Sequence, residues 1–359
     1  MLRCRASCDN EIRVIDLSAQ SGAEGAATLR HITGGLRASQ ALYVAAKLNV
    51  ADHLARKSMN SAELATLTGA NSAALHRVMR TLCALDVFAE SSTGEFSLNS
   101  TAELLRSDAT GSYRAAVLLL VGDVRWRCWS DLLGTVQAGG GGAERALGMG
   151  LFDFYAAHPE ESEIHDQAMR GISAAQVAAV LSAMDFSQAG TVVDVGGGTG
   201  ELLAGILAAN PRLRGVLFDL PHVVAHAPRV LSDSGVTDRV QVMGGSFFDS
   251  VPLDGNTYML KNVIHDWDDA RATTILRNCR MAMTSADKLL VIERGLPELG
   301  QPGRKADAFL LDLEMLVMAP GGRERTGSEF AKLLSDSDFK LVRTVPTSSL
   351  ISILEAHPV

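Results

Sequence analysis

The sequence predicts two kinds of domain: a doubly wound α/β domain with a mostly parallel sheet in the C-terminal half, and a mainly α-helical region before it. In the C-terminal half, five short β-rich runs alternate with helical segments, an order that is typical of parallel strands buried on both faces. The N-terminal half instead carries apolar residues at helical spacing. The length of 359 residues suits about two domains.

Four segments are expected along the chain. Residues 1–27 have no continuous apolar stretch of the kind found in secretory signals, and we expect them to form a flexible arm. Residues 28–135 show the order helix, helix, turn, helix and short hairpin, which is typical of a winged helix. Residues 136–184 should form a linker with connecting helices. Residues 185–359 should form the α/β domain, with an antiparallel pair of strands at its edge.

Composition disfavours several classes of function. The formal net charge of -8 argues against a broad nucleic-acid surface. No apolar run reaches the roughly 18 residues that a membrane-spanning helix needs, so we expect no membrane partner. The five cysteines are odd in number and widely spaced, which favours free thiols and a cytoplasmic location.

A glycine-rich loop, DVGGGTG, follows a predicted strand and opens a predicted helix. Glycines let the backbone approach a ligand closely, and a helix N-terminus offers free N–H groups. Asp219 ends the next strand, where an acid suits ribose hydroxyls. The G-x-G-x-x-G fingerprint of dinucleotide sites fits in neither register, because Glu201 or Leu203 takes the place of the third glycine. The loop matches instead the D-x-G-x-G-x-G motif of S-adenosylmethionine (SAM)-dependent methyltransferases.

Six motifs in order extend this match: DVGGGTG, FDLPHVV, GGSFFDSVP, LKNVIHDWDD, LLVIERGLP and PGGRERT. Together they resemble the small-molecule O-methyltransferases of the caffeic-acid and acetylserotonin type. The resemblance is greatest to bacterial natural-product enzymes that act on aromatic polyketides, phenazines or naphthoates, and so to antibiotic biosynthesis. It covers roughly residues 30–355. It implies a Rossmann-like SAM-binding domain and a homodimer formed through a winged-helix-like N-terminal dimerisation domain.

The resemblance also implies a cofactor site for SAM, whose product is S-adenosylhomocysteine (SAH), and no metal ion. Asp219 would bind the ribose, and Ser246 and Phe247 would flank the adenine. Lys261 would lie near the adenine or at the outer edge of the site. Plant members usually have aspartate where this chain has Ser246, and a hydroxyl can still bond an adenine amine but without charge. The full set of implied cofactor residues is Asp194, Gly196, Gly198, Asp219, Leu220, Ser246, Phe247 and Lys261.

His265 is the candidate catalytic base, flanked by Glu293 and Glu324 in the motifs VIERG and GGRERT. An imidazole titrates near neutrality and suits removal of a phenol proton. A carboxylate on its other nitrogen would fix the tautomer. Other interpretations are a structural histidine beside a helix capped by Asp266 or Asp268, and a metal site formed with the neighbouring aspartates. No second histidine lies near enough in the sequence to support the metal site.

Aromatic residues cluster before the α/β domain, in a chain that is only 5% aromatic. They predict an apolar, planar substrate slot between the domains, although core packing would explain each of them singly. Methionines add adaptable surface to the same slot. The candidate substrate residues are Trp126, Trp129, Phe152, Phe154, Tyr155, Met169, Asp266, Met315 and Met318.

The sequence therefore predicts a SAM-dependent O-methyltransferase that acts on an aromatic hydroxyl of a small secondary metabolite. One alternative is a SAM-binding relative that methylates nitrogen or carbon, or performs no methylation. The other is a winged-helix regulator that binds DNA. Its candidate recognition helix offers only His76, Arg77 and Arg80, a small basic footprint.

Overall fold

The computed structural model describes residues 17–253, 255–298 and 306–359. Within the arm that the sequence analysis expected to be flexible, residues 1–16 lie outside the described residues. From Leu17 onward the chain is helical, so the rest of that segment is the start of α1 (Leu17–Lys47).

Two compact units make up the chain, and they separate between Ala109 and Thr110. The sequence predicts this boundary near residue 135, close to a run of glycines. That run connects α8 (Leu132–Ala138) to α9 (Gly142–Leu147), and both helices pack against α16 (Ala306–Met318). The glycines are therefore a turn inside the second unit.

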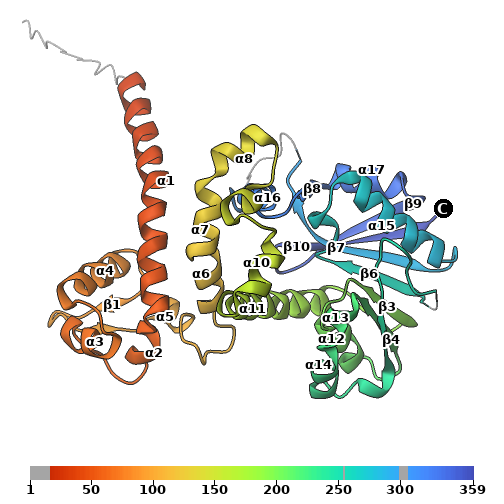
Figure 1. Cartoon of the computed structure of the whole chain (residues 1–359), viewed down its shortest axis with the longest axis horizontal. Coiled ribbons are helices and arrows are strands. Elements are labelled where there is room, and N and C mark those ends of the chain that lie inside the picture. The colour runs from red at the N-terminus through yellow and green to blue at the C-terminus, as the bar shows by residue number, and fades with distance from the viewer. Residues whose placement is uncertain (1–16, 254, 299–305) are drawn as a thin grey trace, which may run out of the picture. The chain divides into compact units, whose positions relative to one another are not determined.

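The first unit is a set of helices followed by a short antiparallel hairpin (Figure 1). Asn60 and Asn71 cap the third and fourth helices, because their side-chain oxygens accept backbone N–H groups of the first turn. In chain order the elements are α1, α2 (Val50–Leu54), α3 (Ser61–Thr68), α4 (Ser72–Ala84), β1 (Ala89–Glu90), β2 (Phe96–Ser97) and α5 (Ser100–Glu103).

The second unit begins with helices that build a core of their own. That core holds a buried ion pair between Arg125 and Glu314, and its apolar members include Cys128, Phe154 and Met318. Besides α8, α9 and α16, the helices are α6 (Arg114–Leu120), α7 (Asp123–Ser130), α10 (Leu151–Ala157) and α11 (Pro159–Ala183).

A mostly parallel sheet follows, in the order β5-β4-β3-β6-β7-β10-β9, with β8 beside the end of β7. The strands β3 to β7 are parallel, and β10 runs antiparallel to both β7 and β9. The antiparallel edge pair is therefore confirmed. The strands are β3 (Thr191–Val195), β4 (Arg214–Asp219), β5 (Val240–Gly244), β6 (Thr257–Lys261), β7 (Lys288–Leu296), β8 (Arg325–Thr326), β9 (Phe339–Pro346) and β10 (Ile351–Pro358).

Helices cover both faces of this sheet (Figure 1). Alternate strand residues enter separate cores: Val193 and Val195 face α15 and α17, whereas Val192 faces α11 and α12. Because β4 lies on one side of β3 and β6 on the other, the strand order reverses at β3, and ligands of such sheets bind at that point beyond the carboxyl ends. The remaining elements are α12 (Glu201–Ala209), α13 (Pro221–Val224), α14 (Ala227–Asp233), η1 (Thr237–Arg239), η2 (Ile264–Asp266), α15 (Asp269–Ala282) and α17 (Gly327–Ser335).

Within the described part of the chain, no helix combines the length and the apolar character needed to cross a membrane.

Candidate functional site

The glycine loop occupies the reversal point between β3 and α12. Gly196 and Gly198 have φ angles of 68° and 62°, a left-handed conformation that favours glycine. A side chain at Gly196 would meet Val263 and the ring of Phe247, whereas one at Gly198 would meet no atom within 4 Å. The loop is thus packed on one side and open on the other, which allows a ligand to approach its backbone.

Two carboxylates lie beside this loop. Asp219 accepts the N–H of Gly198 at 2.8 Å and that of Leu220 at 2.6 Å, and each oxygen keeps capacity for a further donor. Asp194 is 1% exposed, and neither of its oxygens has a hydrogen-bond partner among the described residues. Burial raises the pKa of Asp194 to about 7, although the charge of Lys261 opposes this shift. An unpartnered buried acid of this kind suits a cationic or hydrogen-donating ligand group.

The predicted adenine neighbours follow β5. The Ser246 hydroxyl accepts the N–H of Phe248 at 3.2 Å. The Phe247 ring packs edge-on against Phe248 and Trp267, with centroids 4.9 and 6.2 Å away. These contacts give one side of the loop a rigid aromatic wall.

Lys261 lies on the other face of the sheet from Phe247. Its Nζ donates to Ser173 at 3.3 Å and to Gln176 at 3.4 Å, both on α11. Burial lowers its pKa, while the negative charge of Asp194 raises it. The structure therefore places Lys261 beside Asp194 and α11, away from the aromatic wall, whereas the resemblance implies a place near the adenine or at the outer edge of the site.

His265 lies on η2, the short turn that follows β6. Its Nδ1 is 2.6 Å from Glu293 Oε2, and because a carboxylate only accepts, Nδ1 donates. Glu293 Oε1 accepts the N–H groups of Val263 at 2.9 Å and Ile264 at 2.7 Å. One fully buried carboxylate thus fixes both the turn and the ring, and it leaves Nε2 as the nitrogen available for chemistry.

Charge and burial act against each other at His265. Burial lowers its pKa, but the charge and hydrogen bond of Glu293, together with Asp266 and Glu324, raise it to about 9. For Glu293, burial disfavours the anion, yet His265 and the turn N–H groups outweigh it and lower its pKa. The pair is therefore an imidazolium and a carboxylate at neutral pH.

Glu324 lies near this pair without bonding to it. Its side chain is 2% exposed, and neither oxygen has a hydrogen-bond partner within the described ranges. Burial raises its pKa to about 7, opposed by the charge of His265. Its nearest cation is Arg294, 3.9 Å away, and its backbone N–H donates to Asp312. Glu324 thus influences His265 through charge only.

Two further residues hold the turn in place. Asn262, just before it, adopts a φ of 54°, and its amide donates to Gln176 at 2.7 Å. Arg325 is 1% exposed and donates to the carbonyl oxygens of Ile264 at 3.0 Å and Trp267 at 2.8 Å. The guanidinium also pairs with Asp269 at 2.7 Å, and its two bonds to backbone carbonyl oxygens fix the course of the chain around the imidazole.

The two aspartates considered as helix caps behave differently. Asp268 caps α15, since its side chain accepts the N–H of Arg271 at 2.8 Å. Asp266 caps nothing in α15 because it belongs to η2, where its Oδ1 lies 3.3 Å from His265 Nε2. Although the Asp266 side chain is 49% exposed, the protein atoms packed around it still raise its pKa, opposed by the charge of His265.

The candidate substrate residues separate into two groups. Trp129, Phe154, Tyr155 and Met318 belong to the helical core around α7, α9, α10 and α16. By contrast, Phe152 is 77% exposed, and Trp126 and Met169 are each 37% exposed. Met315 is half-buried on α16. The structure therefore brings four of the aromatic and methionine candidates together, leaves Trp126, Phe152 and Met169 toward solvent, and keeps Met315 half-buried.

Sequence reasoning missed several polar residues of this region. The Arg125 guanidinium pairs with Glu314, which also accepts the indole N–H of Trp129 at 2.6 Å. Gln176 binds both Lys261 and Asn262 from α11. Glu314 interrupts an otherwise apolar stretch, LEMLVM, and this could have signalled a buried pair. A single glutamine on a long helix carries no comparable signal.

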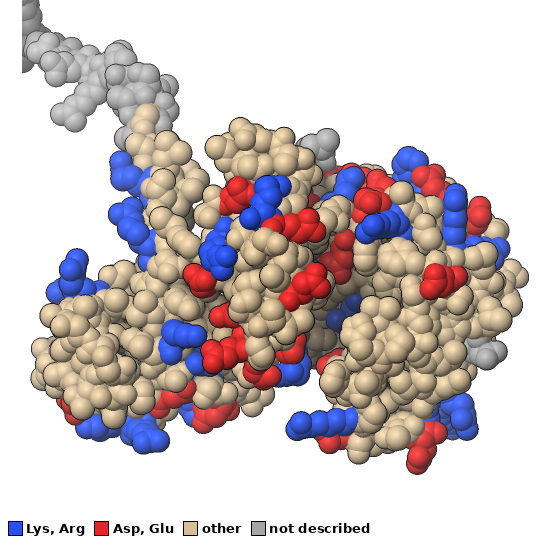
Figure 2. Space-filling view, in the orientation of Figure 1, with Lys and Arg blue, Asp and Glu red and all other residues tan. Residues whose placement is uncertain are grey.

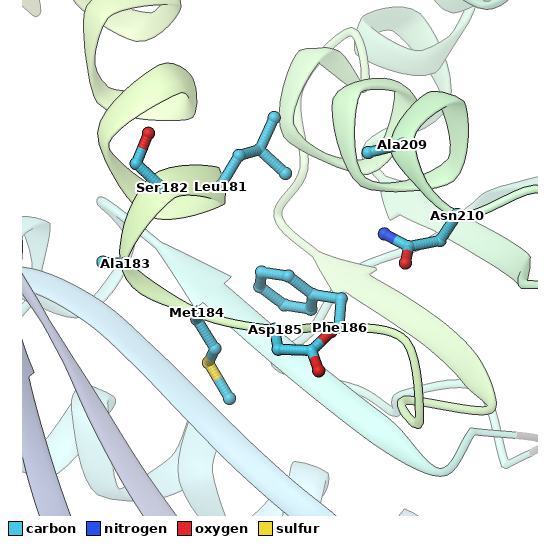
Figure 3. Close-up of a pocket in the computed structure, with 8 residues that line it drawn as sticks. All are labelled: Leu181, Ser182, Ala183, Met184, Asp185, Phe186, Ala209 and Asn210. Atoms are coloured by element: carbon cyan, nitrogen blue, oxygen red, sulfur yellow. The ribbon is translucent and has the colours of Figure 1, made fainter.

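Two cavities differ in their relation to the site. One of about 400 Å³ is lined by residues such as Met184, Asp185, Phe186 and Asn210 (Figure 3). It lies where α11 and α12 end, at the amino edge of β3 and so opposite the glycine loop. The other, of about 500 Å³, is lined by Glu293, Arg294 and Glu324 among others, beside the His265–Glu293 pair.

Surface charge does not favour a nucleic-acid partner. On the face shown in Figure 2, basic and acidic side chains are interspersed rather than gathered into one basic field. On α4, Arg80 lies 3.8 Å from Glu90, and the His76 ring packs on Phe96 with centroids 5.8 Å apart. Two of the three candidate DNA contacts therefore have partners within their own unit. Nowhere in the described ranges do three His, Cys, Asp or Glu side chains form a group that could hold a metal ion.

Comparison with known proteins places these features in a family. The family model for the O-methyltransferase domain matches residues 129–340, and the model for the O-methyltransferase dimerisation domain matches residues 30–108. The chain is similar to phenazine O-methyltransferase PhzM of Lysobacter antibioticus, with 43% identity over 333 residues that span 92% of this chain and 95% of that protein.

Solved structures of O-methyltransferases have the same fold as this chain. The mitomycin 7-O-methyltransferase MmcR superposes with a TM-score of 0.85 at 33% identity, covering 95% of this chain and 99% of that one. The O-methyltransferase NcsB1 from neocarzinostatin biosynthesis superposes with a TM-score of 0.75 at 31% identity, covering 89% and 96% of the two chains. NcsB1 was solved in complex with SAM and 2-hydroxy-5-methyl naphthoic acid.

Proposed function

The chain belongs to the O-methyltransferase family, and on that premise we propose that His265 is the base of a SAM-dependent methyl transfer to an aromatic hydroxyl. The observation that carries this proposal is the 2.6 Å bond between His265 and Glu293, next to a glycine loop at the reversal point of the sheet. This bond orients the ring so that Nε2 is free to act beside the proposed site of the methyl donor.

The cofactor residues present suit SAM. When bound, this cofactor supplies a reactive methyl group on a positively charged sulfur. Asp219 would accept the ribose hydroxyls, and Phe247 with Ser246 would contact the adenine. Asp194 and Lys261, which lie together near α11, would suit the ammonium and carboxylate of the methionine part. The openness of the loop at Gly198 supports this assignment, because a ligand can lie against its backbone there.

His265 would act on the acceptor through Nε2. A phenol has a pKa of about 10, so at neutral pH its proton must be removed as the new bond forms. Glu293 holds the tautomer in which Nδ1 carries a proton and Nε2 can accept one. Much of the remaining acceleration would come from holding the hydroxyl and the methyl group in line.

We propose a small, planar aromatic metabolite as the acceptor. The printed names of several relatives support this class, including a phenazine O-methyltransferase and a 3-amino-4-hydroxybenzoate 4-O-methyltransferase. The helical cluster containing Trp129, Phe154, Tyr155 and Met318 would supply flat, apolar contacts. Trp126, Phe152, Met169 and Met315 remain proposed contacts, as does Asp266.

A homodimer formed through the first unit is part of the same proposal. The chain carries an O-methyltransferase dimerisation domain over residues 30–108. On α1, the exposed side chains Leu29, Ile32 and Leu36 recur at spacings of three and four residues, so they share one face of the helix. We also propose a cytoplasmic location, which the free thiols of Cys83, Cys128 and Cys279 support.

Two measurements test the function. Calorimetric titration with SAH should give a micromolar dissociation constant, while NADH should not bind. Incubation with labelled SAM and a panel of hydroxyphenazines and dihydroxynaphthoic acids should then yield an O-methylated product, located by mass spectrometry. His265→Ala should reduce turnover by about 100-fold or more while SAH still binds. His265→Gln, which can still donate to Glu293, guards against loss of the fold. Near-normal turnover in both variants would remove His265 as the base.

A further inference from the structure

Both nitrogens of His265 face a carboxylate. Nδ1 donates to Glu293 at 2.6 Å, and Nε2 lies 3.3 Å from Asp266 Oδ1. The two carboxylates differ in access to water: the Glu293 side chain is fully buried, whereas that of Asp266 is 49% exposed. A proton on Nε2 therefore has a partner that reaches solvent, and a proton on Nδ1 does not.

This arrangement poses a problem for a general base. With a pKa of about 9, which burial lowers and Glu293 and Asp266 raise, His265 is protonated in the free protein at neutral pH. An imidazolium has no lone pair with which to accept the phenol proton. The proton on Nε2 must leave before each methyl transfer, and the proton taken from the acceptor must leave afterwards.

We propose that Asp266 is a second catalytic residue, which takes the proton from His265 Nε2 and passes it to solvent water. In this step the N–H bond of Nε2 breaks, its electron pair stays on nitrogen, and an O–H bond forms on Asp266 Oδ1. The acceptor hydroxyl then gives its proton to Nε2 as the carbon–oxygen bond forms and the carbon–sulfur bond breaks. That proton stays on Nε2 until the next turnover, when it leaves by the same route, so one proton is released for each methyl group transferred.

The other charged groups around His265 do not offer this route. Glu293 uses both oxygens for the turn and the ring, and it has no contact with water. Glu324 is 2% exposed and bonds to neither nitrogen. Arg325 and Arg323 contact the backbone carbonyl oxygens of the turn and bear no exchangeable carboxyl proton. Asp266 is thus the carboxylate that joins Nε2 to solvent.

The inference rests on the proposed role of His265, and Asp266→Asn tests it directly. The amide keeps the size of the side chain but accepts no proton. In free protein labelled at histidine, NMR should show the His265 ring titrating about one pH unit or more lower in the variant, since an opposite charge is lost. Turnover with labelled SAM and a hydroxyphenazine should nevertheless fall by about 100-fold, because proton removal is lost.

Chemical rescue of Asp266→Ala and a control variant distinguish proton transfer by Asp266 from a purely structural role. Formate or acetate should restore turnover in Asp266→Ala in a concentration-dependent manner, and should not restore it in His265→Gln. Asp233→Asn removes an exposed carboxylate on α14 and should change neither the titration nor turnover. The inference about Asp266 is overturned if the His265 titration does not shift in Asp266→Asn, or if small acids do not rescue Asp266→Ala. In that case, an inactive His265→Gln would still support His265 as the base. An active His265→Gln overturns both.

Discussion

Glu293 and His265 are joined twice, once through the ring and once through the backbone beside it. Glu293 Oε2 accepts the Nδ1 proton at 2.6 Å, and Oε1 accepts two backbone N–H groups of the turn that carries the ring. Position and ionisation of the imidazole therefore depend on one side chain of β7.

Replacing Glu293 with glutamine should affect both functions of this carboxylate. The amide offers one oxygen where the carboxylate uses two, so either the ring or the turn loses its acceptor. We expect kcat to fall by about 100-fold or more and the His265 pKa to fall, because the neighbouring negative charge is gone. Rate measurements across the pH range test this. A kcat within a few-fold of the native value would show that the orientation of the ring does not depend on Glu293.

Protonation of His265 should stabilise the fold over a defined pH range. Its folded pKa of about 9 exceeds the ordinary value of about 6.5. The stabilisation is therefore fully present below about pH 6.5 and is lost as pH rises through 9. Denaturant unfolding should show a stability difference between native protein and His265→Gln that is largest at about pH 6 and small near pH 10. A difference that does not vary with pH would contradict the raised pKa.

Asp194 should lower the unfolding stability of the free protein at alkaline pH and raise its affinity for SAH. Its folded pKa of about 7 lies above the ordinary value of about 3.9, so its favourable contribution is lost as pH rises through 7. At pH 8 it is a buried anion without a hydrogen-bond partner among the described residues. Asp194→Asn should therefore unfold at higher temperature than native protein at pH 8, by a margin that narrows toward pH 5. SAH should nevertheless bind the variant more weakly, and unchanged affinity would remove Asp194 from the cofactor site.

Asp219 should contribute to binding more than to folding. Its carboxylate accepts the N–H groups of Gly198 and Leu220, and each oxygen keeps capacity for a further donor. Asp219→Ala should raise the dissociation constant of SAH by about tenfold or more, since hydrogen bonds to a charged group contribute roughly 1.5–3 kcal/mol. Circular dichroism should show an intact fold, and Asp233→Ala on α14 is the control. Equal affinities of the two variants would refute the ribose role.

The Arg125–Glu314 pair should show strong coupling in a double-mutant cycle. Both side chains are buried in the helical core, so removing one leaves the other as an unpaired buried charge. Arg125→Met and Glu314→Gln should each cost about 3–5 kcal/mol of unfolding free energy. The double variant should cost less than the sum of the two. Additive losses in urea denaturation would show that the pair does not act as a unit.

The sheet could be predicted because its signal is local. Each central strand is a short apolar run such as VLFD or LLVI, and buried parallel strands need little else. The antiparallel edge was predictable for the same reason. The domain boundary was not, because glycines mark a turn without revealing which helices meet across it. Only the packing of α8 and α9 on α16 places that turn within the second unit.

The site was predictable where residue type and strand end coincide. His265, Asp219 and the loop glycines all lie at carboxyl ends of strands, and the structure brings His265 and Glu293 into contact. Side-chain direction was harder to predict. Lys261 is the last residue of β6, and its side chain points to α11, because alternate residues of a strand face opposite sides. Hydrogen-bond partners that are distant in sequence, such as Gln176 and Asn262, cannot be identified from the local residue pattern.

Arg325 complements Glu293 from the opposite side of the catalytic turn. The guanidinium takes the carbonyl oxygens of Ile264 and Trp267, while the carboxylate takes the N–H groups of Val263 and Ile264. The His265 ring is therefore held by two side chains of neighbouring strands, and neither belongs to the helices proposed to contact the acceptor. We expect substitutions in α7 and α10 to change which molecules are accepted without moving the imidazole. Because the two sets of residues belong to different elements, acceptor preference could change through substitutions in these helices while the residues around His265 stay the same.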